Sequence, residues 1–293
     1  MLRKSKILIL GARGMLGTGL AQEFAGNNEF YPHTLQSVGV YLWDRGEIDV
    51  TSEKQVKDKI SYLKPEVVIN ATGYTDVDGA EDNQEMAFKV NAEAVKFITV
   101  ACEQISARLV HFSTEYVFDG TDKNGYVEES IVKPLNIYGQ SKAAGEKYVL
   151  AYSLGYLIRT SWLYGHAPQK GKPRGLNFID TVQKLATEKP EVKIVNDQFG
   201  KPTYTKDLAK SVRELLIGSY QPGIYHLVNE NVCSWYDLAK EIFKLKNVKT
   251  PLSPISSSEY PTKAKRPQYA VLLNIKLPPL RNWQEALKDY LNL

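Results

Sequence analysis

The feature that most constrains this chain is a run of three evenly spaced glycines that directly follows a short apolar segment. Residues 7–10 are uninterrupted Ile and Leu, as expected for a strand buried on both faces of a parallel sheet. Gly11, Gly14 and Gly17 come next, and a helical segment reaches to about residue 25. A glycine turn between a strand and a helix lets the backbone approach a phosphate, which the helix N-terminus attracts. This opening therefore predicts a dinucleotide-binding α/β fold rather than a glycine turn without a ligand.

Strand and helix signals continue to alternate along the first half of the chain. The expected strands are residues 38–43, 67–70, 108–112 and 156–159. The expected helices are residues 53–62, 87–102 and a segment around Lys142. Strands that alternate with helices are joined by right-handed connections and build a parallel sheet with helices on both faces. We therefore predict the α/β fold class, with a Rossmann-type doubly wound parallel sheet.

The second half has a looser rhythm, and we expect it to add a smaller C-terminal α/β substrate domain. Strands are expected at residues 192–195 and 224–228, helices at 206–217 and after Trp283, and loops at 166–177 and 251–261. The predicted dinucleotide-binding domain is 1–165 with a segment near 204–230 that returns to its sheet, and the predicted substrate domain is 166–203 with 231–293.

The composition excludes several other classes of protein. The net charge of +4 comes from 37 basic and 33 acidic residues that are mixed along the chain, which argues against a nucleic-acid partner. The two cysteines, Cys102 and Cys233, lie among apolar neighbours and indicate buried thiols in a reducing compartment. The four histidines are scattered, so no metal site is expected. The apolar run at 7–10 is too short for a signal peptide or a membrane span, and we expect a cytoplasmic protein without a membrane partner.

Tyr138 and Lys142 form the arrangement with the strongest chemical implication. Positions four apart on a helix share a face, so the phenol and the ammonium group should point into the same cleft. A nearby cation lowers the pKa of a phenol from about 10 toward neutral pH, where it can exchange protons. Such a pair alone is usually a surface feature. Here it follows a strand that ends at Thr114, at the sheet edge that holds the glycine turn, and these side chains predict a catalytic site with Phe112 beside the cofactor.

The expected cofactor is NADPH or NADH, and different residues near the end of the second strand favour each of them. Asp44 could accept hydrogen bonds from the adenosine ribose, which favours NADH. Arg45 and Arg13 could instead neutralise the 2′-phosphate of NADPH. Asp49 and Val50 either line the adenine or form a surface turn. The sequence leaves the coenzyme preference open.

With these motifs in place, the chain resembles the dTDP-4-dehydrorhamnose reductase family of extended short-chain dehydrogenases nearly from end to end. The segments with this resemblance are 11–17, 65–71, 75–81, 113–120, 134–139, 159–162, 196–200, 260–261 and 266–267. The later segments matter most, because short-chain enzymes with the Tyr-Lys pair in general lack them. The resemblance implies NAD(P)H-dependent reduction of the C4 keto group of dTDP-4-dehydro-L-rhamnose to dTDP-L-rhamnose.

The resemblance also implies roles for individual residues. Tyr138 would donate the proton to the sugar C4 oxygen, Lys142 would hold the nicotinamide ribose, and Thr114 would orient the carbonyl group. The residues expected to bind the cofactor are Gly11, Arg13, Gly14, Met15, Leu16, Gly17, Asp44, Arg45, Asp49, Val50, Gly73, Tyr74, Thr75, Phe112, Tyr138 and Lys142.

The substrate side is expected to depart from the family pattern at one position. Thr114, Glu115 and Trp162 would face the sugar nucleotide, and Arg266 would pair with its pyrophosphate, a geometry that guanidinium groups suit. The family usually has Asp where this chain has Glu115, so the fit of the sugar could differ. Gly73 stands where the family often has Ala, which should be harmless.

Some family members dimerise through a metal bound by acidic residues, and the matching positions here are Gly19 and Lys206. We therefore expect a monomer, or a weak homodimer without that metal bridge. Other reductases or epimerases of nucleotide-linked 4-keto-6-deoxysugars share the fold and remain alternatives. A dehydratase would need two adjacent carboxylates after the Thr, and Glu115 is followed by Tyr116. A non-catalytic NAD(P)-binding subunit, like the regulatory subunit of methionine adenosyltransferase, is a further alternative.

Overall fold

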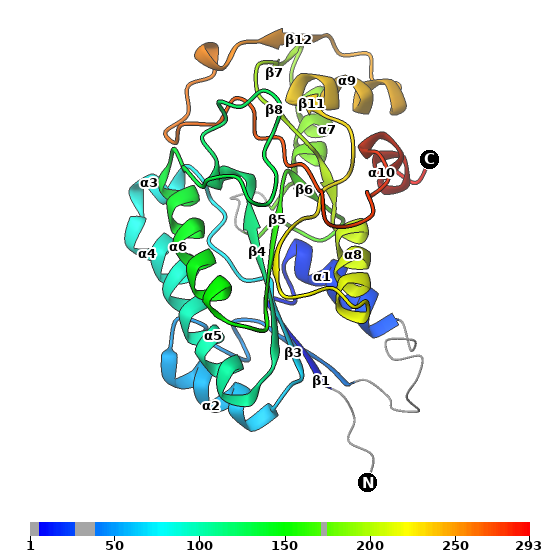
Figure 1. Cartoon of the computed structure of the whole chain (residues 1–293). Helices are drawn as coiled ribbons and strands as arrows, with labels where there is room; N and C mark the ends of the chain where they lie inside the picture. The colour runs from blue at the N-terminus through cyan, green and yellow to red at the C-terminus, as the bar shows by residue number, and fades with distance from the viewer. Residues whose placement is uncertain (1–5, 27–38, 171–174) are drawn as a thin grey trace.

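The computed structural model describes residues 6–26, 39–170 and 175–293 (Figure 1). The predicted start of the second strand at Val38 lies outside these ranges, as does part of the loop expected at 166–177. Within them, the main sheet has six parallel strands in the order β10-β5-β4-β3-β1-β2. These strands are β1 (Lys6–Leu10), β2 (Gly39–Trp43), β3 (Val67–Asn70), β4 (Arg108–Thr114), β5 (Gly155–Thr160) and β10 (Gly223–His226). The predicted doubly wound parallel sheet is confirmed.

Helices cover both faces of this sheet, because the apolar strand residues point to both sides (Figure 1). On one face lie α1 (Met15–Gly26) and α8 (Thr205–Ile217), and on the other lie α2 (Glu53–Leu63), α5 (Ala94–Ile105) and α6 (Ile137–Ala151). Leu16, Leu20 and Leu208 fill the first core, whereas Ile60 and Ile98 belong to the second. Both cores are therefore built from strand residues and the apolar stripe of each helix.

The helix expected at 87–102 is interrupted. It consists of α4 (Gln84–Phe88), a π-helical turn η1 (Lys89–Glu93) and α5, and the short helix α3 (Gly79–Asp82) precedes it. A π-turn adds a residue to the helical repeat and is frequent at functional sites. The turn here brings Asn91 into the interior.

The second half of the chain forms a smaller cap above the carboxyl ends of the main strands (Figure 1). Its elements are β6 (Leu163–Tyr164), α7 (Phe178–Glu188), β7 (Val192–Val195), β8 (Phe199–Gly200), β9 (Thr203–Tyr204), β11 (Cys233–Ser234), α9 (Trp235–Leu245), β12 (Leu252–Ile255) and α10 (Trp283–Tyr290). The described part of the chain also has two 3-10 turns: η2 (Glu115–Val117) follows β4 of the main sheet, and η3 (Ser257–Glu259) follows β12.

One loop expectation is wrong, because β12 lies inside the segment 251–261 and pairs in parallel with β7. Its Pro254 is tolerated because β12 has β7 as its one partner among the described strands, so the missing N–H breaks no ladder on the other side. The strand at 192–195 is confirmed, and β10 returns to the main sheet beside β5, ending at His226 rather than at residue 228. The domain boundaries themselves stay a prediction.

Two further observations concern the whole described chain. Cys102 and Cys233 are buried free thiols, and burial raises the pKa of both well above that of an exposed thiol. Among the helices in the described ranges, none combines the length and the apolar character needed to cross a bilayer.

Candidate active site

The glycine turn joins β1 to α1 by a very tight path. Gly11 has a φ of +73°, a left-handed conformation that favours glycine, and its N–H donates to the carbonyl of Trp43 at 2.8 Å. A Cβ on Gly17 would collide with the carbonyl oxygen of Gly11, so the helix approaches the turn closely only because residue 17 is glycine. The turn thus leaves the N-terminus of α1 facing open space at the sheet edge.

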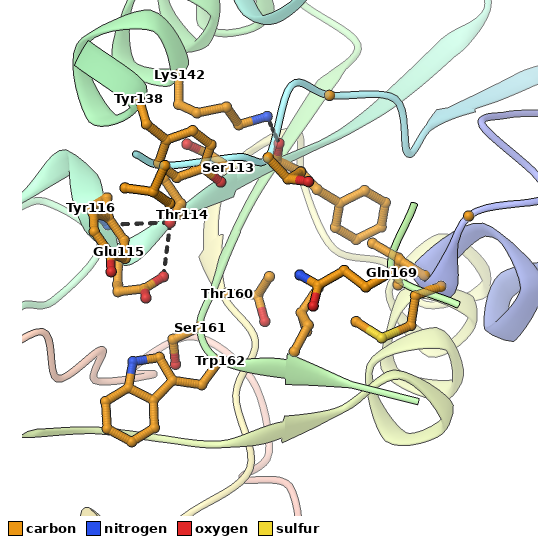
Figure 2. Close-up of a pocket in the computed structure, with 18 of the residues that line it drawn as sticks. Ser113, Thr114, Glu115, Tyr116, Tyr138, Lys142, Thr160, Ser161, Trp162 and Gln169 are labelled. Atoms are coloured by element: carbon orange, nitrogen blue, oxygen red, sulfur yellow. Dashed lines mark hydrogen bonds between the residues drawn. The ribbon is translucent and has the colours of Figure 1, made fainter. Parts of the chain in front are cut away.

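That edge opens into a cavity of about 310 Å³, and Figure 2 shows the side chains around it. Eleven of the predicted site residues line it: Gly14, Met15, Leu16, Gly73, Thr75, Phe112, Thr114, Glu115, Tyr138, Lys142 and Trp162. The other lining residues were not predicted as site residues, although some lie in the segments with the family resemblance. They are Ala71, Thr72, Val77, Ser113, Tyr116, Thr160, Ser161, Leu163, Gln169, Lys170, Phe178 and Trp235.

Tyr138 and Lys142 lie on the same face of α6, as their spacing predicts. Asn136 caps this helix by accepting a hydrogen bond from the N–H of Gly139 at 2.8 Å, which fixes where the first turn begins. Lys142 is buried, and its Nζ donates to the carbonyl oxygen of Phe112 at 2.6 Å. The hydroxyl of Thr114, at the end of β4, lies beside the phenol of Tyr138 and acts to lower its pKa.

The electrostatics of the phenol differ from the sequence-based prediction. Burial raises the pKa of Tyr138 above its ordinary value, the charge of Glu115 raises it further, and the Thr114 hydrogen bond opposes both. The predicted lowering of this pKa by Lys142 is therefore wrong for this structure, because the ammonium group is directed to a backbone carbonyl. Burial in turn lowers the pKa of Lys142 to about 8, against a smaller opposing effect of Glu146.

Glu115 is the second titratable group at this end of the cavity. It is 3% exposed, and its Oε2 accepts the hydroxyl proton of Thr114 at 2.8 Å. Burial raises the pKa of Glu115 to about 7, whereas the Thr114 hydrogen bond and the charge of Arg266 lower it. The carboxyl group therefore changes its protonation state near neutral pH.

Asn91 supports the site from the π-turn, and no sequence motif singled it out. Its amide accepts the N–H of Tyr74 at 2.9 Å and donates to the carbonyl of Tyr74 and to the hydroxyl of Ser141. Ser141 donates in turn to the carbonyl of Tyr138. Asn91 thus connects the loop after β3 to the first turn of α6 and fixes their separation.

Two buried hydroxyl groups in the lining have no hydrogen-bond partner within the described part of the chain. These are Ser113 Oγ and Thr160 Oγ1, which lie on the neighbouring strands β4 and β5. Buried polar groups are normally satisfied, so hydroxyls left open at a cavity suit a polar ligand. Together with the glycine turn, they make the cavity suitable for a dinucleotide and a polar substrate.

The turn after β2 lies at the far end of the glycine loop and is already satisfied internally. The two carboxylate oxygens of Asp44 accept the backbone N–H of Arg45 at 2.8 Å and of Arg13 at 3.0 Å. Burial raises the pKa of Asp44, but these bonds and Lys170 lower it more, so the net shift is downward. The Arg13 side chain is 60% exposed and pairs with Glu47 at 2.6 Å. Lys170 is the basic side chain that pairs with Asp44, at 3.5 Å.

The remaining predicted residues do not line the cavity. Gly11 and Gly17 shape the turn beneath it, Asp49 accepts hydrogen bonds from Thr51, and Val50 packs on the core. Arg13, Asp44, Arg45 and Tyr74 are likewise outside the lining. Their cofactor roles stay predictions.

Arg266 lies behind the sugar side of the cavity. Its Nη2 donates to Asp78 at 2.6 Å, and its guanidinium carbon lies 5.7 Å from the centre of the Tyr116 ring. It also lines a second hollow of about 530 Å³, where Lys263 and Lys265 are its basic neighbours. Its Nη1 is buried without a partner in the described ranges, which leaves one donor for a ligand.

The two positions considered above for a metal-bridged dimer, Gly19 and Lys206, carry no carboxylate. Lys206 forms an ion pair with Asp289 at 3.0 Å, and Gly19 packs against Thr205. The described residues hold no group of His, Cys, Asp and Glu side chains suited to a metal ion.

Comparison with known proteins gives one consistent family. The family model described as the RmlD substrate binding domain matches residues 5–293. The spore coat polysaccharide biosynthesis protein SpsK of Bacillus subtilis is 35% identical over 98% of this chain and 97% of its own length. The dTDP-4-dehydrorhamnose reductase of Aggregatibacter actinomycetemcomitans is 36% identical over 97% and 98%. A crystal structure of the dTDP-4-dehydrorhamnose reductase of Bacillus anthracis in complex with NADP is 34% identical, covers 99% of both chains and has a TM-score of 0.90.

Proposed function

Because the chain belongs to the RmlD substrate binding domain family, we propose that it is an NAD(P)H-dependent oxidoreductase of nucleotide-sugar synthesis. The proposed reaction is reduction of the C4 keto group of dTDP-4-dehydro-L-rhamnose to dTDP-L-rhamnose. The observation that supports it best is that Thr114, Tyr138 and Lys142 line the same cavity as the glycine turn. The relative from Bacillus anthracis was crystallised with NADP, which supports NADPH as the first coenzyme to test.

The residues of this chain fit a nicotinamide dinucleotide. The pyrophosphate would lie at the N-terminus of α1, near Gly14 and Met15, where free N–H groups and the helix dipole favour negative charge. Lys142 and Gly73 would lie beside the nicotinamide ribose. When bound, the nicotinamide supplies the hydride for the reduction.

The other steps belong to the side chains of the cavity. Tyr138 donates its phenolic proton to the C4 oxygen as negative charge develops there, and Thr114, held by the backbone N–H of Tyr116, lies beside the phenol. The high pKa of Tyr138 keeps the phenol protonated until that charge appears. Trp162 stacks on Trp235 with their ring centroids 3.5 Å apart, and it forms a flat wall for the sugar.

A second candidate function is reduction of another nucleotide-linked 4-keto-6-deoxysugar. It is favoured by Glu115, whose long carboxyl side chain lines the sugar end of the cavity and could select the hexose. Dehydration is disfavoured because Glu115 is followed by Tyr116, so no second adjacent carboxylate exists there.

We further propose that the chain works as a monomer or a weak homodimer without a metal bridge, since Lys206 already pairs with Asp289. A cytoplasmic location fits the buried free thiols Cys102 and Cys233.

The proposed function is tested by mixing the protein with NADPH and dTDP-4-keto-6-deoxy-L-mannose and following oxidation of the coenzyme. We expect one coenzyme oxidised for each sugar reduced. The same assay with NADH and with 4-keto sugars of other configuration ranks the coenzymes and the substrates. Coenzyme binding without turnover of any of these sugars would contradict the proposal and would favour a non-catalytic subunit.

A further inference from the structure

Glu115 is placed so that its carboxyl group reaches back to the residue before it. It opens the 3-10 turn η2 directly after Thr114, which ends β4 (Figure 2). Its Oε2 lies 2.8 Å from Thr114 Oγ1, and the side chain is buried on the wall of the cavity. The carboxyl group therefore contacts the hydroxyl that holds Tyr138.

The direction of the hydrogen bond between Thr114 and Glu115 depends on the charge of Glu115. A hydroxyl group has one proton to donate and two lone pairs to accept with. When Glu115 is ionised, Thr114 donates its proton to that carboxylate and accepts the backbone N–H of Tyr116 at 3.2 Å. When Glu115 is protonated, its carboxylic acid can donate to Thr114 Oγ1, which frees the Thr114 proton for the nearby oxygen of Tyr138. A proton can therefore pass from Glu115 through Thr114 to Tyr138.

The charges around Glu115 are few. Arg266 is the cation that acts on it, and that guanidinium group is already paired with Asp78 at 2.6 Å. Tyr116 and Tyr138 are the neighbouring phenols, and burial raises the pKa of each, so both are uncharged near neutral pH. The carboxyl group of Glu115, with its pKa raised to about 7, is the group in this cluster that can gain or lose a proton under ordinary conditions.

We propose that Glu115, acting through Thr114, is the proton store that restores the phenol of Tyr138 after each reduction. The inference rests on the proposed function and adds a step to it. Tyr138 becomes a phenolate when its proton passes to the keto oxygen. The hydroxyl proton of Thr114 then moves to the phenolate, and the carboxylic acid proton of Glu115 moves to Thr114 Oγ1. Glu115 is left as a carboxylate and takes a proton from water in the cavity.

The test is the Glu115→Gln variant, which keeps the shape and the hydrogen bond to Thr114 but cannot release a proton. For the wild type, the protonated carboxyl group is the active form, so kcat should fall as pH rises through about 7. In Glu115→Gln the fall near pH 7 should disappear, so that any remaining fall lies near the pKa of Lys142, about 8. The kcat of this variant should be about 10- to 100-fold lower, near the low end of a proton-transfer contribution. The first turnover should stay fast, so a burst of one product per site should precede a slow steady state.

A merely structural role would not produce that burst. Cofactor affinity should be unchanged in Glu115→Gln, and the solvent isotope effect on kcat should rise because proton return has become limiting. Glu115→Asp keeps a titrating carboxyl group one methylene shorter, and it should retain the alkaline fall of kcat at a reduced rate. Glu129→Gln, which changes an exposed carboxylate paired with Lys276 at 2.7 Å, is the matched control and should behave as the wild type.

Two results would overturn the inference while leaving the reductase function standing. One is a wild-type kcat that does not fall above neutral pH, and this needs no variant. The other is a Glu115→Gln enzyme that keeps the alkaline fall and shows no burst. Failure of the wild type to reduce any 4-keto sugar would instead contradict the proposed function itself.

Discussion

The end of β4 and the turn after β2 use similar polar side chains in opposite ways. At the end of β4, Lys142 and Glu115 are buried, and burial moves the pKa of each toward neutral pH, to about 8 and about 7. At the turn after β2, Arg13 and Glu47 are partly exposed and paired, and hydrogen bonding lowers the pKa of Glu47. The first group of residues can change charge near neutral pH, whereas the lowered pKa of Glu47 keeps that carboxyl group ionised.

This difference separates chemistry from recognition. A desolvated group has a protonation state that its neighbours control, which is what proton transfer requires. An exposed ion pair is screened by salt and can be exchanged for a ligand phosphate at little loss. We therefore expect substitutions at the β4 end to change the rate, and substitutions at the β2 end to change coenzyme affinity.

The largest effect should come from Tyr138→Phe. Removal of the phenolic proton donor should lower kcat about 10²- to 10⁴-fold, the usual contribution of a general acid, with cofactor affinity unchanged. Steady-state rates and a coenzyme titration measure the two quantities. Tyr148→Phe, on the exposed side of the same helix, is the control and should keep the wild-type rate. A fully active Tyr138→Phe enzyme would show that another group protonates the sugar.

The second comparison sets a buried ion pair against an exposed one. Glu146 lies on α6 beneath the reaction centre and accepts two hydrogen bonds from Arg159, at 2.7 and 2.9 Å, with both side chains under 5% exposed. Glu146→Gln should lower the free energy of unfolding by about 3–5 kcal/mol, because Arg159 is left buried and uncompensated. Glu47→Gln should lower it by less than about 1 kcal/mol. Urea unfolding of the two variants measures both, and equal losses would contradict the contrast.

The smallest effect should come from Arg13→Ser at the β2 end. Loss of one exposed cation near the adenosine ribose should weaken NADPH binding about fivefold to tenfold, which corresponds to about 1 kcal/mol, and leave NADH binding unchanged. Titration of both coenzymes at low and high salt measures this, and the NADPH difference should shrink at high salt. Equal losses for the two coenzymes would show that Arg13 does not read the 2′-phosphate.

Features that neighbouring residues determine could be predicted from the sequence, whereas features that depend on contacts between distant residues could not. The glycine turn and the Tyr138–Lys142 spacing are local patterns, and the fold confirms the strands and helices around them. Asn91 could not be predicted, because its partners Tyr74 and Ser141 lie far along the chain and meet only after folding.

Other differences have the same physical origin. The raised pKa of Tyr138 depends on the burial of its phenol and on Glu115, neither of which the spacing of residues reveals. The segment of β12 was predicted as a loop because it contains Pro254, and proline is rare within strands. An edge strand tolerates it. Both oxygens of Asp44 accept backbone N–H groups from its own turn, so its predicted role as a ribose acceptor requires that these bonds be shared.

The most direct test of the central claim is the fate of the hydride in one turnover. NADPH carrying deuterium at the transferred position of its nicotinamide ring is mixed with the protein and dTDP-4-keto-6-deoxy-L-mannose, and the product is examined by NMR. The account predicts a dTDP-6-deoxyhexose with deuterium at C4 and nowhere else on the sugar. Deuterium at another carbon, or an unchanged sugar beside bound coenzyme, would contradict it.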